Sequence, residues 1–578
     1  MKLIPMPKSI TEYEGVFTHK TVRLVTSIPD GRIARAIQKL PISDNGAPLT
    51  IEMGTNSSKA YALELTENKV FLRADGPAGV FYGIQTLRQI FENEIIPYLY
   101  IEDKPDFSYR GFYHDVTRGR VPTVETIKHL IDEMAYYKMN SLQLYVEHTF
   151  AFAEMADIAE RTGYLTAEEI KELDDYCYEN FIEFIPSIAT FGHLYELLQK
   201  PEYKELCVLE DYEPSYHFWV ERMRHHTIDP VNPQSFWLVK SLIDQYMPLF
   251  RTDKFNICCD ETFDLSEGRH KNGDAEKLYV DFVLQLISYL KSKGKTVMMW
   301  ADILLKHPDA IPKLPDDIQF LNWHYGKEVN EDAIAVFERL AKNQIVCPGT
   351  QSWATFCPWI EHAEINISRV AQLGRQYNAL GILNTNWGDY GHPCTLGMCM
   401  YPMVFGAAKS WNADTQIDDN WEQSVDRLLF GQPQALALLR KLDSLQLTEA
   451  WSTLTCWYSN HISREKLPVP IPPEAEILHC IHGCKDISEM LKGQKWEKDG
   501  YREEMLIAAE GMQVIAQIFA AIAGYAVPQE ISVLQWLETY KQQWRKESKE
   551  SELYVIENLF LFAEENAIQK TKESIYEP

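Results

Sequence analysis

Hydrophobic and polar positions follow three different patterns along the chain, and each pattern predicts a different kind of region. Residues 1–104 carry short runs with a two-residue period, at 21–25, 61–65 and 69–73, and finish in an amphipathic stretch over 79–91. A two-residue period is typical of half-buried strands, whereas apolar positions three and four apart indicate a helix. This region is therefore predicted to be a small α+β domain.

Between residues 105 and 405, runs typical of strands alternate with helical stretches such as 124–137 and 278–293. The clearest strands are predicted at 141–147, 184–189, 254–259, 296–300, 318–323 and 381–385. Alternating β/α units over about 300 residues fit a (β/α)8 TIM barrel. A doubly wound parallel sheet is the alternative, but its Gly-x-Gly-x-x-Gly first turn does not occur. Residues 406–578 carry Leu, Ala, Glu and Gln at helical spacing, which predicts a helical C-terminal region.

The net charge and the cysteine content limit which binding partners and which cellular compartment are expected. The 578 residues include 56 Lys and Arg against 83 Asp and Glu, a net charge of −27, which disfavours nucleic-acid and anionic membrane partners. No signal-type segment and no run of about 20 apolar residues occurs, so we expect a cytoplasmic protein. The odd total of 11 scattered Cys indicates reduced thiols rather than a disulfide framework. The oligomeric state stays open.

Two adjacent acids stand at the end of the strand predicted over 254–259. Alternation places Asn256, Cys258 and Asp260 towards the barrel interior, and Glu261 follows where the strand ends. Active sites of TIM barrels are built at the carboxyl ends of the strands. Neighbouring carboxyl groups with different burial have pKa values pushed apart, which suits an acid/base pair. By itself such a pair is more typical of a solvated loop.

Other predicted strand ends bring further side chains to the same rim. Glu147 ends the strand over 141–147, and Arg118 follows the predicted first strand, residues 111–117. Trp300, Trp323 and Trp387 each end a predicted strand. Aromatic faces stack on the C–H faces of sugar rings, while carboxylates and Arg bind hydroxyl groups. This combination is suited to carbohydrate hydrolysis.

The sequence resembles glycoside hydrolase family 20, the β-N-acetylhexosaminidases, over residues 1 to about 400. Residues 109–118 are similar to the family's first barrel strand, and residues 134–140 to its first helix. Residues 185–193 are similar to its strand that ends in Pro-Gly-His. Residues 255–261 resemble its His-x-Gly-Gly-Asp-Glu signature, and residues 387–389 its Trp-x-Glu motif. Departures from the family pattern indicate a divergent branch, with substitutions at Asn256, Cys258, Cys259, Asp389 and the pair Glu147-His148.

The resemblance implies an exo-acting, retaining enzyme that uses the 2-acetamido group of its own substrate as the nucleophile. Asp260 would orient that group and Glu261 would serve as general acid and base. The sugar would be bound by His193, by Arg118 with Asp389, and by walls from Trp300, Trp323 and Trp387. Trp353 or Tyr325 is the candidate cap on the acetamido group. The resemblance implies neither a metal nor a cofactor, and leaves GlcNAc and GalNAc undistinguished.

Two other functions fit part of the pattern. One is a carbohydrate-binding protein on an inactive hydrolase scaffold, although both Asp260 and Glu261 are present. The other is a conventional β-glycosidase with Glu147 and Glu261 as its two carboxylates. A separate cluster, His479-Cys-Ile-His-Gly-Cys484, has no standard zinc spacing and is interpreted as packing.

Overall fold

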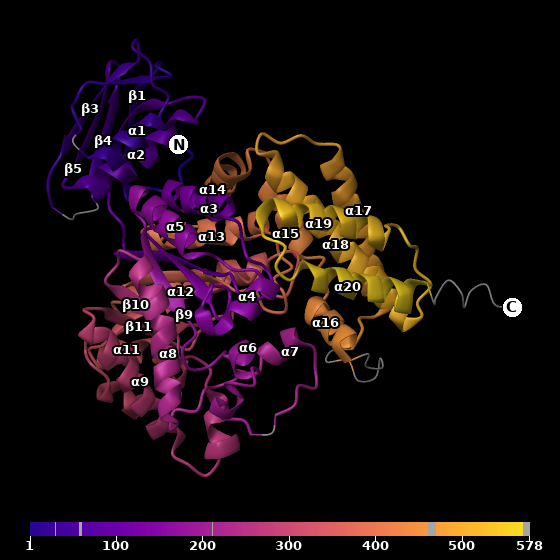
Figure 1. The fold of residues 1–578 in the computed structure, drawn as a ribbon. Helices are drawn as coiled ribbons and strands as arrows, with labels where there is room; N and C mark the ends of the chain where they lie inside the picture. The colour runs from indigo at the N-terminus through magenta and orange to yellow at the C-terminus, as the bar shows by residue number, and fades with distance from the viewer. Residues whose placement is uncertain (29, 57–59, 211, 461–466, 468–469, 570–578) are drawn as a thin grey trace.

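Three regions follow one another in the computed structural model, which describes residues 1–569 apart from 29, 57–59, 211, 461–466, 468 and 469. An N-terminal α+β domain, a closed barrel of parallel strands and a helical C-terminal region lie in that order along the chain (Figure 1). The predicted fold class is therefore confirmed.

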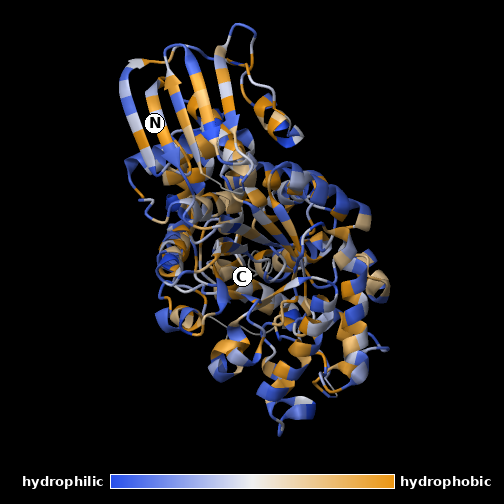
Figure 2. Ribbon diagram, turned by 90° about the vertical axis from the view of Figure 1, so that its left-hand side faces the viewer, coloured by the Kyte–Doolittle hydropathy of each residue, from blue (hydrophilic) through white to orange (hydrophobic). Residues whose placement is uncertain are grey.

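The N-terminal domain is a six-stranded sheet with helices α1 (Gly31–Gln38) and α2 (Pro77–Phe91). Its strands pair in the order β1-β6-β4-β5-β3-β2. Buried and partly exposed positions alternate along β4, as expected when one face packs on a core and the other meets solvent. Figure 2 shows this alternation as stripes along the strands of the sheet. The strands are β1 (Ser9–Val16), β2 (Val22–Leu24), β3 (Ala47–Met53), β4 (Tyr61–Thr66), β5 (Lys69–Ala74) and β6 (Pro97–Asp103).

Eight parallel strands close the central barrel. Every residue of the first two barrel strands is buried, because their outer face lies under helices and their inner face fills the barrel. The strands are β7 (Tyr109–Asp115), β8 (Ser141–Val146), β9 (Glu183–Ile188), β10 (Lys254–Asn256), β11 (Thr296–Trp300), β12 (Gln319–Trp323), β13 (Asn343–Cys347) and β14 (Gly381–Asn386). The sequence patterns missed β13.

Helices connect the barrel strands on the outside. The longer ones are α3 (Val124–Tyr136), α5 (Ala167–Glu179), α8 (Pro233–Tyr246), α9 (Ala275–Ser292), α11 (Glu331–Arg339), α12 (Ile360–Gln376) and α13 (Leu396–Trp411). Short helices α4 (Ala156–Thr162), α6 (Tyr195–Leu198), α7 (Phe218–Arg222) and α10 (Asp302–Lys306) belong to the connections. Thr123 caps α3 by accepting a hydrogen bond from the backbone of Thr126, which fixes where that helix begins.

The C-terminal region packs as helices α14 (Asp419–Val425), α15 (Ala435–Asp443), α16 (Ala450–Asn460), α17 (Glu474–Lys492), α18 (Asp499–Ala523), α19 (Val533–Glu547) and α20 (Leu553–Ala563). Among the described residues, α18 alone has the length and apolar composition of a membrane span, and 83% of its apolar stretch is buried. Its neighbours α17 and α19 cover it, so α18 is the core helix of this region (Figure 1).

Candidate active site

The chain turns sharply out of β10 to present Asp260 and Glu261 at the rim of the barrel. The strand was predicted to reach residue 259, but it ends at Asn256. Cys258, Cys259 and Glu261 have φ values of 56°, 62° and 50°, which belong to the left-handed region that favours glycine. This backbone cannot continue a β ladder, so the prediction of the strand end was wrong. The inward direction predicted for Asn256 is correct, because its amide donates to Gln143 on β8 over 2.9 Å.

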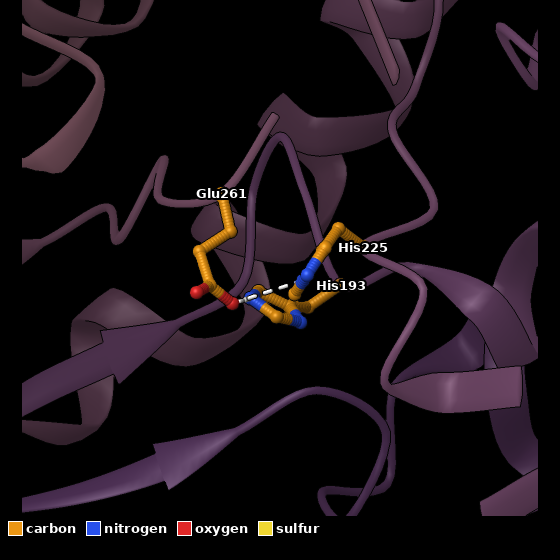
Figure 3. A group of neighbouring side chains, drawn as sticks. All are labelled: His193, His225 and Glu261. Atoms are coloured by element: carbon orange, nitrogen blue, oxygen red, sulfur yellow. Dashed lines mark ion pairs between the residues drawn. The ribbon is translucent and has the colours of Figure 1, made fainter. Parts of the chain in front are cut away.

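One imidazole faces both acids. His193, which is 2% exposed, places Nε2 3.2 Å from Asp260 Oδ2 and 3.3 Å from Glu261 Oε2. A second imidazole, that of His225, approaches Glu261 Oε2 with Nδ1 at 2.9 Å (Figure 3). The side chain of Asp260 is 10% exposed, whereas that of Glu261 is 27% exposed and lies nearer the opening. The structure thus brings the predicted acids and His193 together.

The cluster holds a proton between its imidazole and its carboxylates. Asp260 and Glu261 raise the pKa of His193 to about 10, against the cost of its burial, so Nε2 keeps its proton at neutral pH. The same proximity of His193 and His225 lowers the pKa of Glu261, although burial opposes that change. Arg118 Nη2 lies 3.3 Å from the other ring nitrogen of His193. A guanidinium can only donate, so a neutral ring would turn its N–H towards the carboxylates.

The ligand types in this cluster also raise the question of a metal. Within the described part of the chain, His193, His225 and Glu261 have ligand atoms that all lie within 4.8 Å of one another. A metal ligand must be an unprotonated nitrogen, whereas the nearby Asp260 and Glu261 raise the pKa of His193 and favour its protonated form. The arrangement therefore fits a shared proton better than a metal ion.

Arg118 forms the other end of the site, buried among three carboxylates. Its Nη1 lies 2.8 Å from Asp389 Oδ1 and 3.6 Å from Asp115 Oδ2. Its Nε lies 3.4 Å from Glu147 Oε1, so Glu147 faces the guanidinium. Burial raises the pKa of both Glu147 and Asp389, and Arg118 opposes that increase. The side chain of Asp389 is 20% exposed and is the part of this group open to a ligand.

Aromatic rings form the wall between these two ends. The rings of Trp300 and Trp387 lie 5.8 Å apart, and the Arg118 guanidinium lies 5.3 Å above Trp387. Trp300 is fully buried, so it supports Trp387 from behind rather than offering a face to a ligand. Trp323 stacks on Tyr325 with a centroid distance of 5.0 Å.

Tyr325 connects the remaining tryptophans to this wall. Its hydroxyl accepts a hydrogen bond from Trp387 Nε1 over 2.8 Å, and its ring lies 5.3 Å from Trp353. All four tryptophans predicted at the site thus belong to one aromatic group, with Trp323 and Trp353 placed through Tyr325.

Two residues of the site were missed. His225 comes from the loop after α7, and Asp302 begins α10 and accepts the backbone N–H of Glu261 over 3.0 Å. The pair His225-His226 before a Pro-containing turn was a weak signal, and Asp302 follows Trp300 at a strand end. At the distant cluster, Cys480 and Cys484 are buried while His479 and His482 are exposed, so the four do not face one site and the packing interpretation holds.

Comparisons with known proteins point to one family. The family model described as glycosyl hydrolase family 20, catalytic domain, matches residues 107–379, and the one described as glycosyl hydrolase family 20, domain 2, matches residues 1–104. A β-hexosaminidase of Porphyromonas gingivalis is 28% identical over 360 residues, which are 53% of this chain and 46% of that protein. A β-hexosaminidase of Vibrio furnissii is 24% identical over 60% of this chain and 63% of that protein. The chain thus spans about half to two thirds of these relatives.

A solved structure supports the same fold over 97% of the chain. The X-ray structure of Flavobacterium johnsoniae chitobiase superposes with a TM-score of 0.61 and 18% identity, covering 97% of this chain and 99% of that one. At that identity the likeness concerns the fold alone. Residues beyond 379, which include Trp387, Asp389 and the helical C-terminal region, lie outside the matched family segments.

Proposed function

Because the chain belongs to glycoside hydrolase family 20, we propose that it is an exo-acting, retaining β-N-acetylhexosaminidase that removes terminal β-linked GlcNAc or GalNAc. One observation carries this proposal: the consecutive Asp260 and Glu261 both face Nε2 of His193, at 3.2 and 3.3 Å. Two carboxyl groups with different exposure are thereby held at one reacting centre. Such groups can take different protonation states and different roles.

The proposed chemistry uses the acetamido oxygen of the sugar as the nucleophile. That oxygen attacks the anomeric carbon while Glu261 protonates the glycosidic oxygen. The bond between the anomeric carbon and the glycosidic oxygen then breaks. Asp260, the more buried acid, accepts the amide N–H and stabilises the positive charge of the oxazolinium intermediate. Water then attacks the anomeric carbon, with Glu261 taking its proton. Correct placement of an internal nucleophile and general acid catalysis each contribute several powers of ten.

The proton for Glu261 comes from water in this proposal. In the free protein the pKa of Glu261 is lowered by His193 and His225, so the group is a carboxylate. A bound sugar would cover its exposed side and weaken its contact with His225, and desolvation raises a carboxyl pKa. Glu261, whose side chain is 27% exposed, takes a proton from water as the sugar binds, and His193 Nε2, 3.3 Å away, keeps its own proton.

The opposite end of the site is assigned to the non-reducing sugar. Asp389 and Arg118 offer an acceptor and a set of donors to ring hydroxyls, and Trp387 presents an apolar face beside them. Glu147 faces Arg118 rather than the His193 cluster, which favours a binding role over that of a second catalytic carboxylate.

The test is hydrolysis of four aryl β-glycosides, those of GlcNAc, GalNAc, glucose and galactose. We expect hydrolysis of one or both acetamido sugars, release of the β-anomer first, and inhibition by a thiazoline mimic of the intermediate. Comparable rates on glucose or galactose would instead support a two-carboxylate mechanism. Binding without turnover of any of the four would support the inactive-scaffold alternative.

A further inference from the structure

One of the contacts between the C-terminal helical region and the active-site rim is made by a short segment, residues 547–552. This segment runs beside residues 119–123, the loop that directly follows Arg118. The backbone N–H of Thr123 donates to Glu547 O over 2.9 Å, and that of Glu552 donates to Gly119 O over 3.1 Å. Pairing along both ends of the segment fixes the loop against the C-terminal region.

Glu552 places its carboxylate against one further rim element, the short helix α7. It is 1% exposed, and it is the residue directly before α20. Trp219 Nε1 donates to Glu552 Oε2 over 2.5 Å, and Arg222 donates from Nη1 to Oε2 over 3.1 Å and from Nη2 to Oε1 over 2.5 Å. Both donors lie on α7, which ends three residues before His225.

Arg222 extends this contact to the loop that carries His193. Its Nη2 also donates to Glu196 Oε1 over 2.7 Å, and Glu196 lies on α6, three residues after His193. Near the same junction, the backbone N–H of Leu194 donates to His226 O over 3.0 Å. The loops that present His193 and His225 are thus connected to each other and, through Arg222, to Glu552.

We propose that Glu552 is a positioning residue, which holds the loops of Arg118, His193 and His225 in one arrangement from outside the barrel. Its backbone fixes the Arg118 loop and its carboxylate fixes α7. The buried guanidinium of Arg222 has Glu552 and Glu196 as its carboxylate partners, so loss of Glu552 leaves its charge only partly compensated. The helical region beyond the matched family segments thereby completes the site.

The proposal rests on the proposed function only for its kinetic readout. The variant is Glu552→Gln, which keeps the size of the side chain and removes its charge. The matched control is Glu550→Gln, two residues away, where the same change affects an exposed ion pair with Arg545. Both are assayed for kcat/KM on a nitrophenyl glycoside and on a disaccharide of the same sugar. Hydrogen exchange is measured over residues 117–123 and 217–227.

We expect Glu552→Gln to lower kcat/KM by about 10- to 100-fold, the effect typical of a misplacement of about 1 Å. The loss should be larger on the disaccharide, because His225 contacts the general acid and an unactivated leaving group depends on that acid. Exchange should rise in both segments, and Glu550→Gln should match the wild type. A variant that merely unfolds more easily loses active protein and slows both substrates equally.

Normal kinetics and normal exchange in a folded Glu552→Gln variant would overturn the proposal, as would equal slowing of both substrates. If Glu552→Gln does not fold, the test uses Trp219→Phe, which removes a single hydrogen bond to Glu552. This variant should raise hydrogen exchange over residues 217–227. No change in exchange there would overturn the proposal. If the wild type hydrolyses none of the aryl glycosides, the proposed function fails. The exchange measurement then still decides the role of Glu552.

Discussion

Asp302 holds the backbone of Glu261 in its left-handed conformation, because its Oδ2 accepts the Glu261 N–H over 3.0 Å at a residue with a φ of 50°. A non-glycine residue in this region stores strain, which persists only where neighbouring contacts oppose its release. Burial and the nearby charge of Asp260 raise the pKa of Asp302 to about 7. The group that fixes the proposed acid is therefore itself partly protonated near neutral pH.

Replacing Asp302 by Asn should change how stability depends on pH. The folded wild type keeps a proton on Asp302 up to about pH 7, whereas the unfolded chain releases it near the ordinary value of 3.8. The folded state therefore binds more protons between these values, and this group makes stability fall as pH rises through them. The Asn side chain of the Asp302→Asn variant cannot titrate. As pH rises, the free energy of unfolding of the wild type should therefore fall relative to that of the variant by up to about 1.4 kcal/mol per pH unit. Thermal unfolding of both proteins at about pH 5 and about pH 7 measures this. Parallel pH dependences would contradict it.

The two acids should respond differently to the leaving group. Glu261→Gln should slow a disaccharide by about 10²- to 10⁴-fold and an activated nitrophenyl glycoside much less, because only the poor leaving group needs a proton. Asp260→Asn should slow both substrates by similar factors, because it misplaces the internal nucleophile. Values of kcat/KM for both variants on both substrates provide the comparison. Equal sensitivity of the two variants to the leaving group would mean that the roles are assigned wrongly.

Chelation should leave activity unchanged. The carboxylates of Asp260 and Glu261 keep His193 Nε2 protonated, which opposes metal binding at the cluster. Dialysis against EDTA, followed by an assay with and without added zinc, measures this. Loss of activity that zinc restores would show that the cluster is a metal centre.

Thiol titration should give different results for the native and unfolded protein. All 11 Cys are free thiols in the structure, and ten of them are buried while Cys456 is partly exposed. The unfolded chain should therefore titrate 11 thiols, whereas the native protein should react quickly at Cys456 only. Substituting Cys456 by Ser should remove the fast phase, and fast reaction of several native thiols would contradict the packing described here.

A buried ion pair at the junction of the N-terminal domain and the barrel should be important for stability. Lys138 Nζ lies 3.3 Å from Asp103 Oδ2, and both side chains are at most 1% exposed. Lys138→Met should destabilise the protein by about 3–5 kcal/mol, because it leaves a buried carboxylate without its countercharge. Denaturant unfolding measures the loss. Adding Asp103→Asn to the Lys138→Met variant should recover part of the lost free energy of unfolding. A further loss of similar size in the double variant would argue against a direct pairing of the two residues.

The sequence was sufficient to predict side chains fixed by regular strands. Trp300 ends β11 and Trp387 directly follows β14, so a barrel with the predicted direction of strands had to bring them to one rim. It was insufficient where irregular backbone decides the position. His225 lies on a loop with a left-handed φ of 61°, and no periodic pattern describes such a segment. Glu552 is 330 residues from Arg222 in sequence, and only tertiary packing brings them together.

The enclosure of Arg118 has a consequence for how the site meets its ligand. The positive charge of its guanidinium is already balanced by Asp115, Glu147 and Asp389. A sugar hydroxyl that binds there replaces a contact of Asp389, and no unpaired charge is neutralised. Salt screens exposed charges over about 10 Å but acts weakly on buried ones. A neutral sugar should therefore bind with the same affinity in dilute buffer and in concentrated salt, despite the net charge of −27 that surrounds it.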